Sequence, residues 1–124
     1  MFRALRRHWP EYLMEAVGLA LFMISAGFFA TLLEDPESSA HQALASPFLR
    51  RALMGLAMGL TAVVLIYSPL GKRSGAHLNP AVTLTFLRLR KVAIADGCGY
   101  VLAQFLGGVF GVYMICALYQ CRFL

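Results

Sequence analysis

Charged side chains are scarce in this chain. Only 14% of its 124 residues are Asp, Glu, Lys or Arg, and 60% are hydrophobic, whereas a soluble domain carries about 25% charge. Cysteine is sparse too: Cys98, Cys116 and Cys121 are odd in number and lack metal-ligand spacing, so apolar packing is the simplest interpretation. The chain also lacks a Ser/His/Asp set and a carboxylate pair, which argues against an enzyme and implies no metal and no cofactor.

The chain contains three long runs of uncharged residues. Residues 16–33, 52–71 and 97–121 hold 18, 20 and 25 residues without a charge. A helix needs about 20 apolar residues to cross a bilayer, and three such runs leave too little polar sequence to cover a soluble core. We therefore predict an all-α transmembrane protein with spans over about 11–33, 48–67 and 93–118. The first run is too long for a cleavable signal and should stay in the mature chain.

The basic residues are distributed unevenly about these spans. Three acidic residues, Glu34, Asp35 and Glu37, lie in the predicted outer loop with Arg50 and Arg51, and Arg122 follows the last span. The opposite side holds eight basic residues: Arg3, Arg6, Arg7, Lys72, Arg73, Arg88, Arg90 and Lys91. By the positive-inside rule the N-terminus is cytoplasmic. The net charge of +5 is thus explained by membrane orientation, and no nucleic-acid partner is expected.

A fourth apolar segment is too short to span. Arg73 and Arg88 bracket only 14 uncharged residues, which favours a re-entrant loop and half-helix over about 74–89. Asn79 stands at the cap position and Pro80 at the first helical position. Two interpretations of Asn79 stay open: its side chain caps the half-helix, or its amide N–H groups face a pore. In a pore, these donors and the positive helix end would favour neutral polar solutes and repel cations.

Polar groups near this segment are the other candidates. The carbonyls of Gly75, Ala76 and His77 precede the half-helix and would need water or a solute as partner at membrane depth. Glu15 in the first span and Gln104 in the third are expected to brace the loop, Glu15 through backbone N–H groups or His77.

Small residues recur at helical spacing on two spans. Gly55 and Gly59 form one GxxxG pair, and Gly107 and Gly111 form another. Because such pairs let helices approach closely in lipid, both are predicted to lie at tight helix contacts.

Residues 74–83, SGAHLNPAVT, resemble the signature around the first Asn-Pro-Ala motif of the aquaporin family, also called major intrinsic proteins. Within that family, the sequence most resembles bacterial members. The resemblance implies passive transport of water or small neutral solutes such as glycerol. It also implies loop-bracing roles for Glu15 and Gln104. The implied pore-lining residues are Asn79, Pro80, Ala81, Gly75, Ala76, His77 and, at an outer constriction, Met58.

Family members have six spans in two inverted halves, each with one Asn-Pro-Ala loop. Residues 1–124 resemble the N-terminal half alone, an aquaporin-like half-repeat of three spans plus the re-entrant element. Three hypotheses follow: part of a longer channel, a half-channel that needs an inverted or complementary half, or a small membrane interaction protein that conducts nothing. The expected partners are the lipid bilayer, the solute and a further copy or complementary half, in a bacterial inner membrane.

Overall fold

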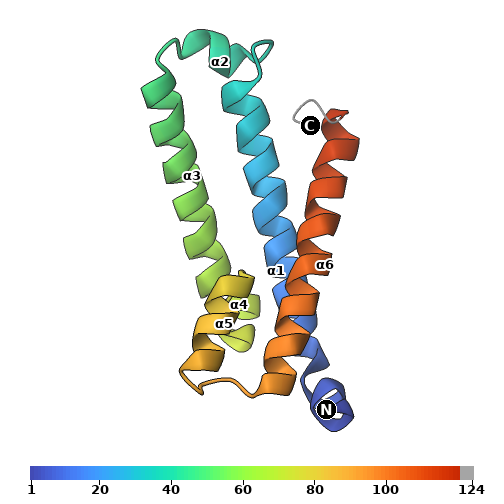
Figure 1. Ribbon diagram of the computed structural model, residues 1–124. Helices are drawn as coiled ribbons and strands as arrows, with labels where there is room; N and C mark the ends of the chain where they lie inside the picture. The colour runs from blue at the N-terminus through green and yellow to red at the C-terminus, as the bar shows by residue number, and fades with distance from the viewer. Residues whose placement is uncertain (121–124) are drawn as a thin grey trace.

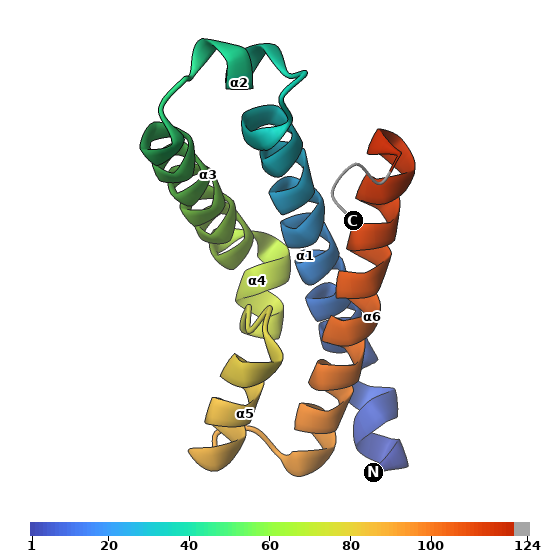
Figure 2. The ribbon, with the colours of Figure 1, turned by 45° about the horizontal axis from the view of Figure 1, so that its top comes forward.

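The computed structural model describes residues 1–120 of the chain, and Arg122 and Cys121 lie outside that range. The regular secondary structure in these residues is helical, as predicted. The helices are α1 (Phe2–Glu34), α2 (Ser39–Ala43), α3 (Pro47–Tyr67), α4 (Pro69–Ser74), α5 (Pro80–Arg88) and α6 (Ile94–Tyr119). Three of them, α1, α3 and α6, are long and apolar enough to cross a membrane. They lie side by side with α1 in the middle (Figures 1 and 2).

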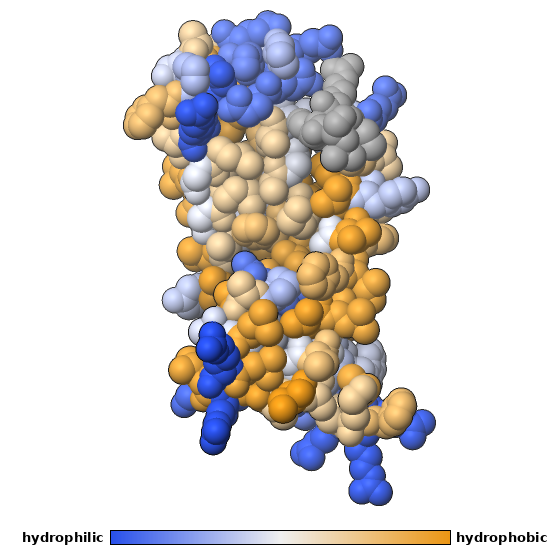
Figure 3. Space-filling model, in the orientation of Figure 1, coloured by the Kyte–Doolittle hydropathy of each residue, from blue (hydrophilic) through white to orange (hydrophobic). Residues whose placement is uncertain are grey.

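The surface is consistent with a membrane position. In Figure 3 apolar side chains cover the middle of the molecule, and hydrophilic side chains gather at its two ends. Large apolar residues that a soluble protein would bury are exposed on all three long helices, including Val64, Phe105 and Val109. Since lipid is the solvent that accepts such a surface, the fold is that of an integral membrane protein.

The first helix begins earlier than the sequence indicated. The first span was predicted over about residues 11–33, whereas α1 starts at Phe2 and contains Pro10 within it. Residues 2–9 include the good helix formers Ala4, Leu5 and several arginines, so the turns before the proline are helical. Pro10 removes one backbone donor and bends the helix, and the first turns leave the axis of the rest of α1 (Figure 2).

The closest helix contact joins α1 and α6, which run in the same direction. A Cβ atom on Gly107 would collide with the backbone of Ala16, and one on Gly111 would press on the backbone of Ala20. The prediction of tight packing is therefore confirmed for this glycine pair. Cys116 is buried on the same helix, whereas Cys98 is exposed.

The second glycine pair behaves differently. A Cβ atom on Gly55 or Gly59 would meet nothing within 4 Å, so the prediction that this pair lies at a tight contact is wrong within residues 1–120. The helix α3 instead meets α1 through a hydrogen bond of 2.8 Å between the hydroxyls of Ser25 and Thr61. The two glycines lie on a different side of α3 from Thr61. Tertiary packing, and not the spacing of small residues, decides which face of a helix makes a contact.

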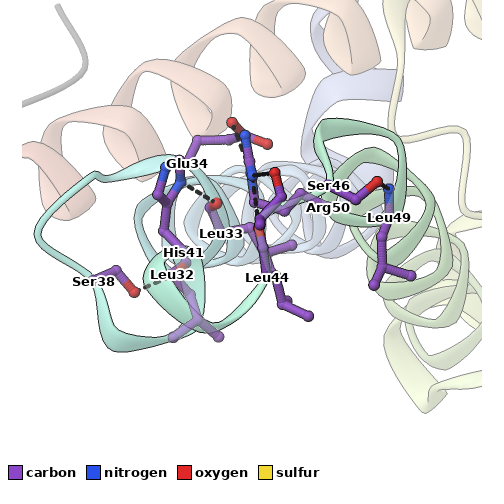
Figure 4. Close-up of polar contacts among 10 residues, drawn as sticks. Leu32, Leu33, Glu34, Ser38, His41, Leu44, Ser46, Leu49 and Arg50 are labelled. Atoms are coloured by element: carbon purple, nitrogen blue, oxygen red, sulfur yellow. Dashed lines mark hydrogen bonds and ion pairs between the residues drawn. The ribbon is translucent and has the colours of Figure 1, made fainter.

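The connector between α1 and α3 contains the short helix α2 and is held by a buried arginine (Figure 4). Arg50 is 8% exposed and donates from Nη1 to the carbonyls of Leu44 at 2.7 Å and Ala45 at 3.3 Å. Its Nε lies 3.6 Å from Glu34 Oε2. The charge of Arg50 is thus offset by two carbonyls and by Glu34. Most of the other basic residues lie at the opposite end of the molecule.

The chain between α3 and α5 turns back into the bundle. The second span was predicted over about residues 48–67, and α3 ends at Tyr67. A separate short helix, α4, follows because Ser68 caps it by accepting from Gly71 N at 3.1 Å. After α4 the loop 75–79 enters the bundle, and α5 returns to the end where the N-terminus lies (Figures 1 and 2). Gly71 is required here, since a Cβ would collide with the carbonyls of Leu65 and Ile66.

Candidate functional site

The loop of residues 75–79 has an irregular backbone that its own residues do not favour. Gly75 ends α4 with φ +91°, and Ala76 and Leu78 have φ of 48° and 50°. Left-handed conformations cost non-glycine residues about 1–3 kcal/mol each and persist only where the surroundings enforce them. The loop is therefore held in place from outside.

Glu15 is the group that holds it. This carboxylate is fully buried on α1 and accepts four hydrogen bonds. At Oε1 it accepts from Ser74 Oγ at 2.8 Å and His77 N at 3.0 Å. At Oε2 it accepts from Leu78 N at 2.7 Å and Gln104 Nε2 at 2.9 Å. Because every partner is a donor, the arrangement suits an ionised carboxylate.

Gln104 links this anchor to the half-helix. It is fully buried, as is Thr83, and its Nε2 also donates to Thr83 Oγ1 at 3.0 Å. Thr83 Oγ1 lies 3.0 Å from His77 Nδ1. The fully buried side chains of Glu15, Gln104 and Thr83 thus join α1, the loop, α5 and α6 in one network.

His77 is packed as well as hydrogen-bonded. Its ring stacks on Phe86 with centroids 4.7 Å apart and meets the edge of Tyr100 at 5.0 Å. Tyr100 in turn donates from its hydroxyl to the carbonyl of Ser74 at 2.7 Å.

The depth of this network follows from helix geometry. Gln104 lies ten residues after the start of the 26-residue helix α6, so it is about 15 Å along a helix of about 39 Å at 1.5 Å per residue. Glu15, which accepts from Gln104 and holds the loop, therefore lies well inside the length of the spanning helices and not at their ends. A half-helix that begins at this depth places its positive dipole end there.

Asn79 begins the half-helix at the surface of the bundle. Its Oδ1 accepts from Ala81 N at 2.8 Å, which caps α5, and Pro80 occupies the first turn. The side chain is exposed, and within residues 1–120 its Nδ2 has no hydrogen-bond partner. Capping and presentation of an amide donor are thus compatible, since they use different atoms of one side chain.

The carbonyls before Asn79 are similarly unengaged. Among residues 1–120 no hydrogen bond reaches the carbonyl oxygens of Gly75, Ala76 or His77. Unpaired carbonyls in the hydrocarbon region are costly unless water or other protein reaches them. The loop therefore presents a short run of acceptors followed by the Asn79 donor.

An apolar groove of about 370 Å³ lies beside the start of the half-helix. It is lined by Leu19, Met23, Pro80, Gln104, Phe105, Gly108, Val109 and Val112. Met58, in contrast, is half-buried on α3, which packs mainly on α1 and α4. The fold thus gathers the candidate residues from α1, α5 and α6 around one loop and leaves Met58 on a separate wall.

Sequence reasoning did not assign Ser74, Thr83 or Tyr100 to the network. One signal could have found Thr83: it lies four residues after Asn79, on the face of the half-helix that a brace on another helix would meet. Ser74 and Tyr100 have no comparable local signal, because their roles depend on how α4 and α6 approach each other.

These features define a class: a helical membrane protein in which a buried carboxylate anchors a re-entrant half-helix inside the bundle. The family model for major intrinsic protein matches residues 3–122. The chain therefore belongs to the major intrinsic protein family, which confirms the resemblance of residues 74–83 to that family's signature.

Individual relatives agree with this assignment. The chain is 36% identical over 103 residues to the lens fiber major intrinsic protein of Gallus gallus, covering 83% of this chain and 35% of that protein. It is 45% identical over 56 residues to the glycerol uptake facilitator protein-like 6 of Lactiplantibacillus plantarum, covering 45% of this chain and 26% of that protein. It is 37% identical over 71 residues to an aquaporin of Encephalitozoon cuniculi, covering 57% of this chain and 27% of that protein.

The chain thus spans about a third or less of the length of these relatives. No solved structure matches it.

Proposed function

We propose that this chain forms one wall of a membrane channel for water or small neutral solutes such as glycerol. One observation carries the proposal: Glu15 fixes a strained loop inside the bundle, where Asn79 Nδ2 and the carbonyls of residues 75–77 have no hydrogen-bond partner within residues 1–120. A solute could exchange hydrogen bonds along these acceptors and with the Asn79 donor, one molecule at a time. The positive end of α5 would repel cations at the same point.

The remaining parts of the proposal rest on the family resemblance. Asn79, Pro80 and Ala81 form the centre, residues 75–77 the acceptor ladder, and Met58 contributes from α3 toward an outer constriction. Glu15 and Gln104 serve as braces. The chemistry is passive transport and not catalysis, and lipid and the solute are the only ligands it needs.

The wall needs an opposing surface to enclose a pore. Asn79 is exposed, and the groove beside Pro80 is open along apolar residues. A complementary half or a further copy of the chain would close it, and an oligomer is the expected form. We place the basic end, with the N-terminus, in the cytoplasm of a bacterial cell, with the chain in the inner membrane. Reporter fusions at both ends would test this orientation.

Two substitutions at Asn79 separate conduction from capping. Both Asn79→Ser and Asn79→Asp keep an oxygen that can cap α5, so the helical content and thermal stability should stay close to those of the parent. Asn79→Ser removes the amide donors and should lower permeability. Asn79→Asp adds an anion at the pore centre and should admit cations.

The measurement is stopped-flow light scattering of proteoliposomes under an osmotic gradient, with a cation-leak assay on the same vesicles. The chain is reconstituted alone. Permeability no higher than in empty vesicles would rule out a channel formed by copies of this chain. Permeability that is unchanged by both Asn79 variants would rule out Asn79 as a pore residue and leave capping as its role.

A further inference from the structure

The first two turns of α1, residues 2–9, form a separate amphipathic element that we call the N-terminal anchor. Phe2, Leu5 and Trp9 recur at three- and four-residue spacing and so share one face of the helix. Phe2 is 81% exposed and Trp9 is 58% exposed. Large apolar side chains of this kind would be costly in water, which indicates that something covers this face.

The basic side chains of the anchor are equally accessible. Arg3, Arg6 and Arg7 are exposed and form no ion pair within residues 1–120. Four further basic residues are exposed: Lys72, Arg88, Arg90 and Lys91. They lie on α4, at the end of α5 and in the connector to α6, segments that lie toward the N-terminal end of the molecule (Figure 1). The end therefore combines exposed aromatic residues with a concentration of unpaired positive charge.

Acidic groups at this end do not neutralise that charge. Glu11 lies 3.2 Å from Arg73 Nε. Asp96 Oδ1 accepts from Tyr12 at 2.6 Å and lies 2.8 Å from His8 Nδ1. Both carboxylates are thus engaged with residues other than the arginines of the anchor.

The anchor is also held at a defined level. The 33 residues of α1 are about 50 Å long, and a hydrocarbon core is about 30 Å thick. Since residues 16–33 are the uncharged stretch, the anchor lies beyond the core on the basic side. The contact of His8 with Asp96 ties it to the start of α6, and the bend at Pro10 turns it away from the bundle axis (Figures 1 and 2).

We propose that the N-terminal anchor binds an anionic lipid leaflet, with Phe2, Leu5 and Trp9 in the headgroup–acyl boundary and Arg3, Arg6 and Arg7 on lipid phosphates. An apolar stripe flanked by arginines at the edge of a bilayer is the pattern of an interfacial helix. Each basic residue near an anionic surface contributes about five-fold in binding. The proposal does not depend on whether the chain conducts a solute.

Trp9 is the single tryptophan of the chain and reports on the anchor directly. The full chain is reconstituted into mixed phosphatidylcholine and phosphatidylglycerol vesicles in which one lipid at a time carries bromine, a quencher of tryptophan fluorescence. We expect brominated phosphatidylglycerol to quench Trp9 more strongly than brominated phosphatidylcholine at the same mole fraction. High salt should weaken this preference, because it screens exposed charges.

The variants test the arginines. The triple change Arg3→Gln, Arg6→Gln and Arg7→Gln should abolish the preference, while lysine at the same three positions should keep it. Arg51→Gln is the matched control, since it removes an exposed charge at the opposite end and should leave the preference unchanged. Equal quenching by both lipids, a preference that survives the glutamine variant, or a Trp9 that neither lipid quenches would each overturn the proposal. Circular dichroism of each variant confirms that the helices are intact.

Discussion

Replacement of Glu15 by glutamine tests the anchor of the re-entrant loop most directly. The carboxylate serves two donors at each of its oxygens: Ser74 Oγ and His77 N at one, and Leu78 N and Gln104 Nε2 at the other. A glutamine has one oxygen and one NH₂ group. Whichever way the amide turns, one pair of donors meets an NH₂ group in place of an acceptor.

The magnitude follows from the two donors that are left unsatisfied. A buried donor left unsatisfied costs about 1–3 kcal/mol, so Glu15→Gln should lower the free energy of unfolding by about 2–6 kcal/mol. The total for a domain is only about 5–15 kcal/mol. Unfolding in SDS, followed by the loss of helical circular dichroism, measures the change. Trypsin cleavage after Lys72 or Arg73, beside the loop, should accelerate in parallel, because the loop opens before the bundle does.

Glu11→Gln is the matched control, one helical turn earlier on α1. Its partner Arg73 is more than half exposed, and an ion pair of this kind contributes about 0–1 kcal/mol. If Glu15→Gln destabilises the chain no more than Glu11→Gln, and trypsin cleaves both equally, Glu15 does not hold the loop. The strained conformations of Ala76 and Leu78 would then need another explanation.

Three further substitutions have expected outcomes. Gly107→Leu should destabilise the bundle by about 1–3 kcal/mol or more, because the new side chain collides with the backbone of Ala16; Gly55→Leu, in open space, should have little effect on the thermal stability in detergent. Arg50→Gln should cost about 1.5–3 kcal/mol through lost charged hydrogen bonds, and hydrogen exchange should rise in residues 35–46 while α6 keeps its protection. Thr83→Val keeps the shape but removes the hydroxyl between the His77 and Gln104 side chains; a loss of about 1–3 kcal/mol in the SDS assay is expected, and a neutral result would contradict the network.

Much of the fold could be predicted because lipid imposes a simple rule. Backbone groups in hydrocarbon must be paired internally, so an uncharged run of about 20 residues becomes a helix. The same rule identifies the segment between Arg73 and Arg88 as too short to span. The predicted span began at about residue 11, whereas the helix that contains it begins at Phe2 and has Pro10 inside it.

The rest depends on tertiary packing, which local patterns do not encode. The glycines at 55 and 59 have the same spacing as those at 107 and 111, yet only the latter pair meets another backbone. The spacing shows which face of the helix carries small residues. Whether another helix packs on that face depends on where the neighbouring helices lie. Ser74 was missed for a similar reason, because its hydroxyl reaches Glu15 only through the path of α4.

The buried carboxylate and the strained loop explain each other. A charge removed from water is costly unless donors surround it, and Glu15 finds four. Two of those donors are the backbone N–H groups of His77 and Leu78, which a regular helix would have used internally. The loop can offer them to Glu15 only because it is not helical, and its non-helical backbone persists because Glu15 accepts them. The same geometry turns the carbonyls of residues 75–77 away from any protein donor within residues 1–120. In a packed core such carbonyls would be a defect, and beside a path for water or a small polar solute they are acceptors.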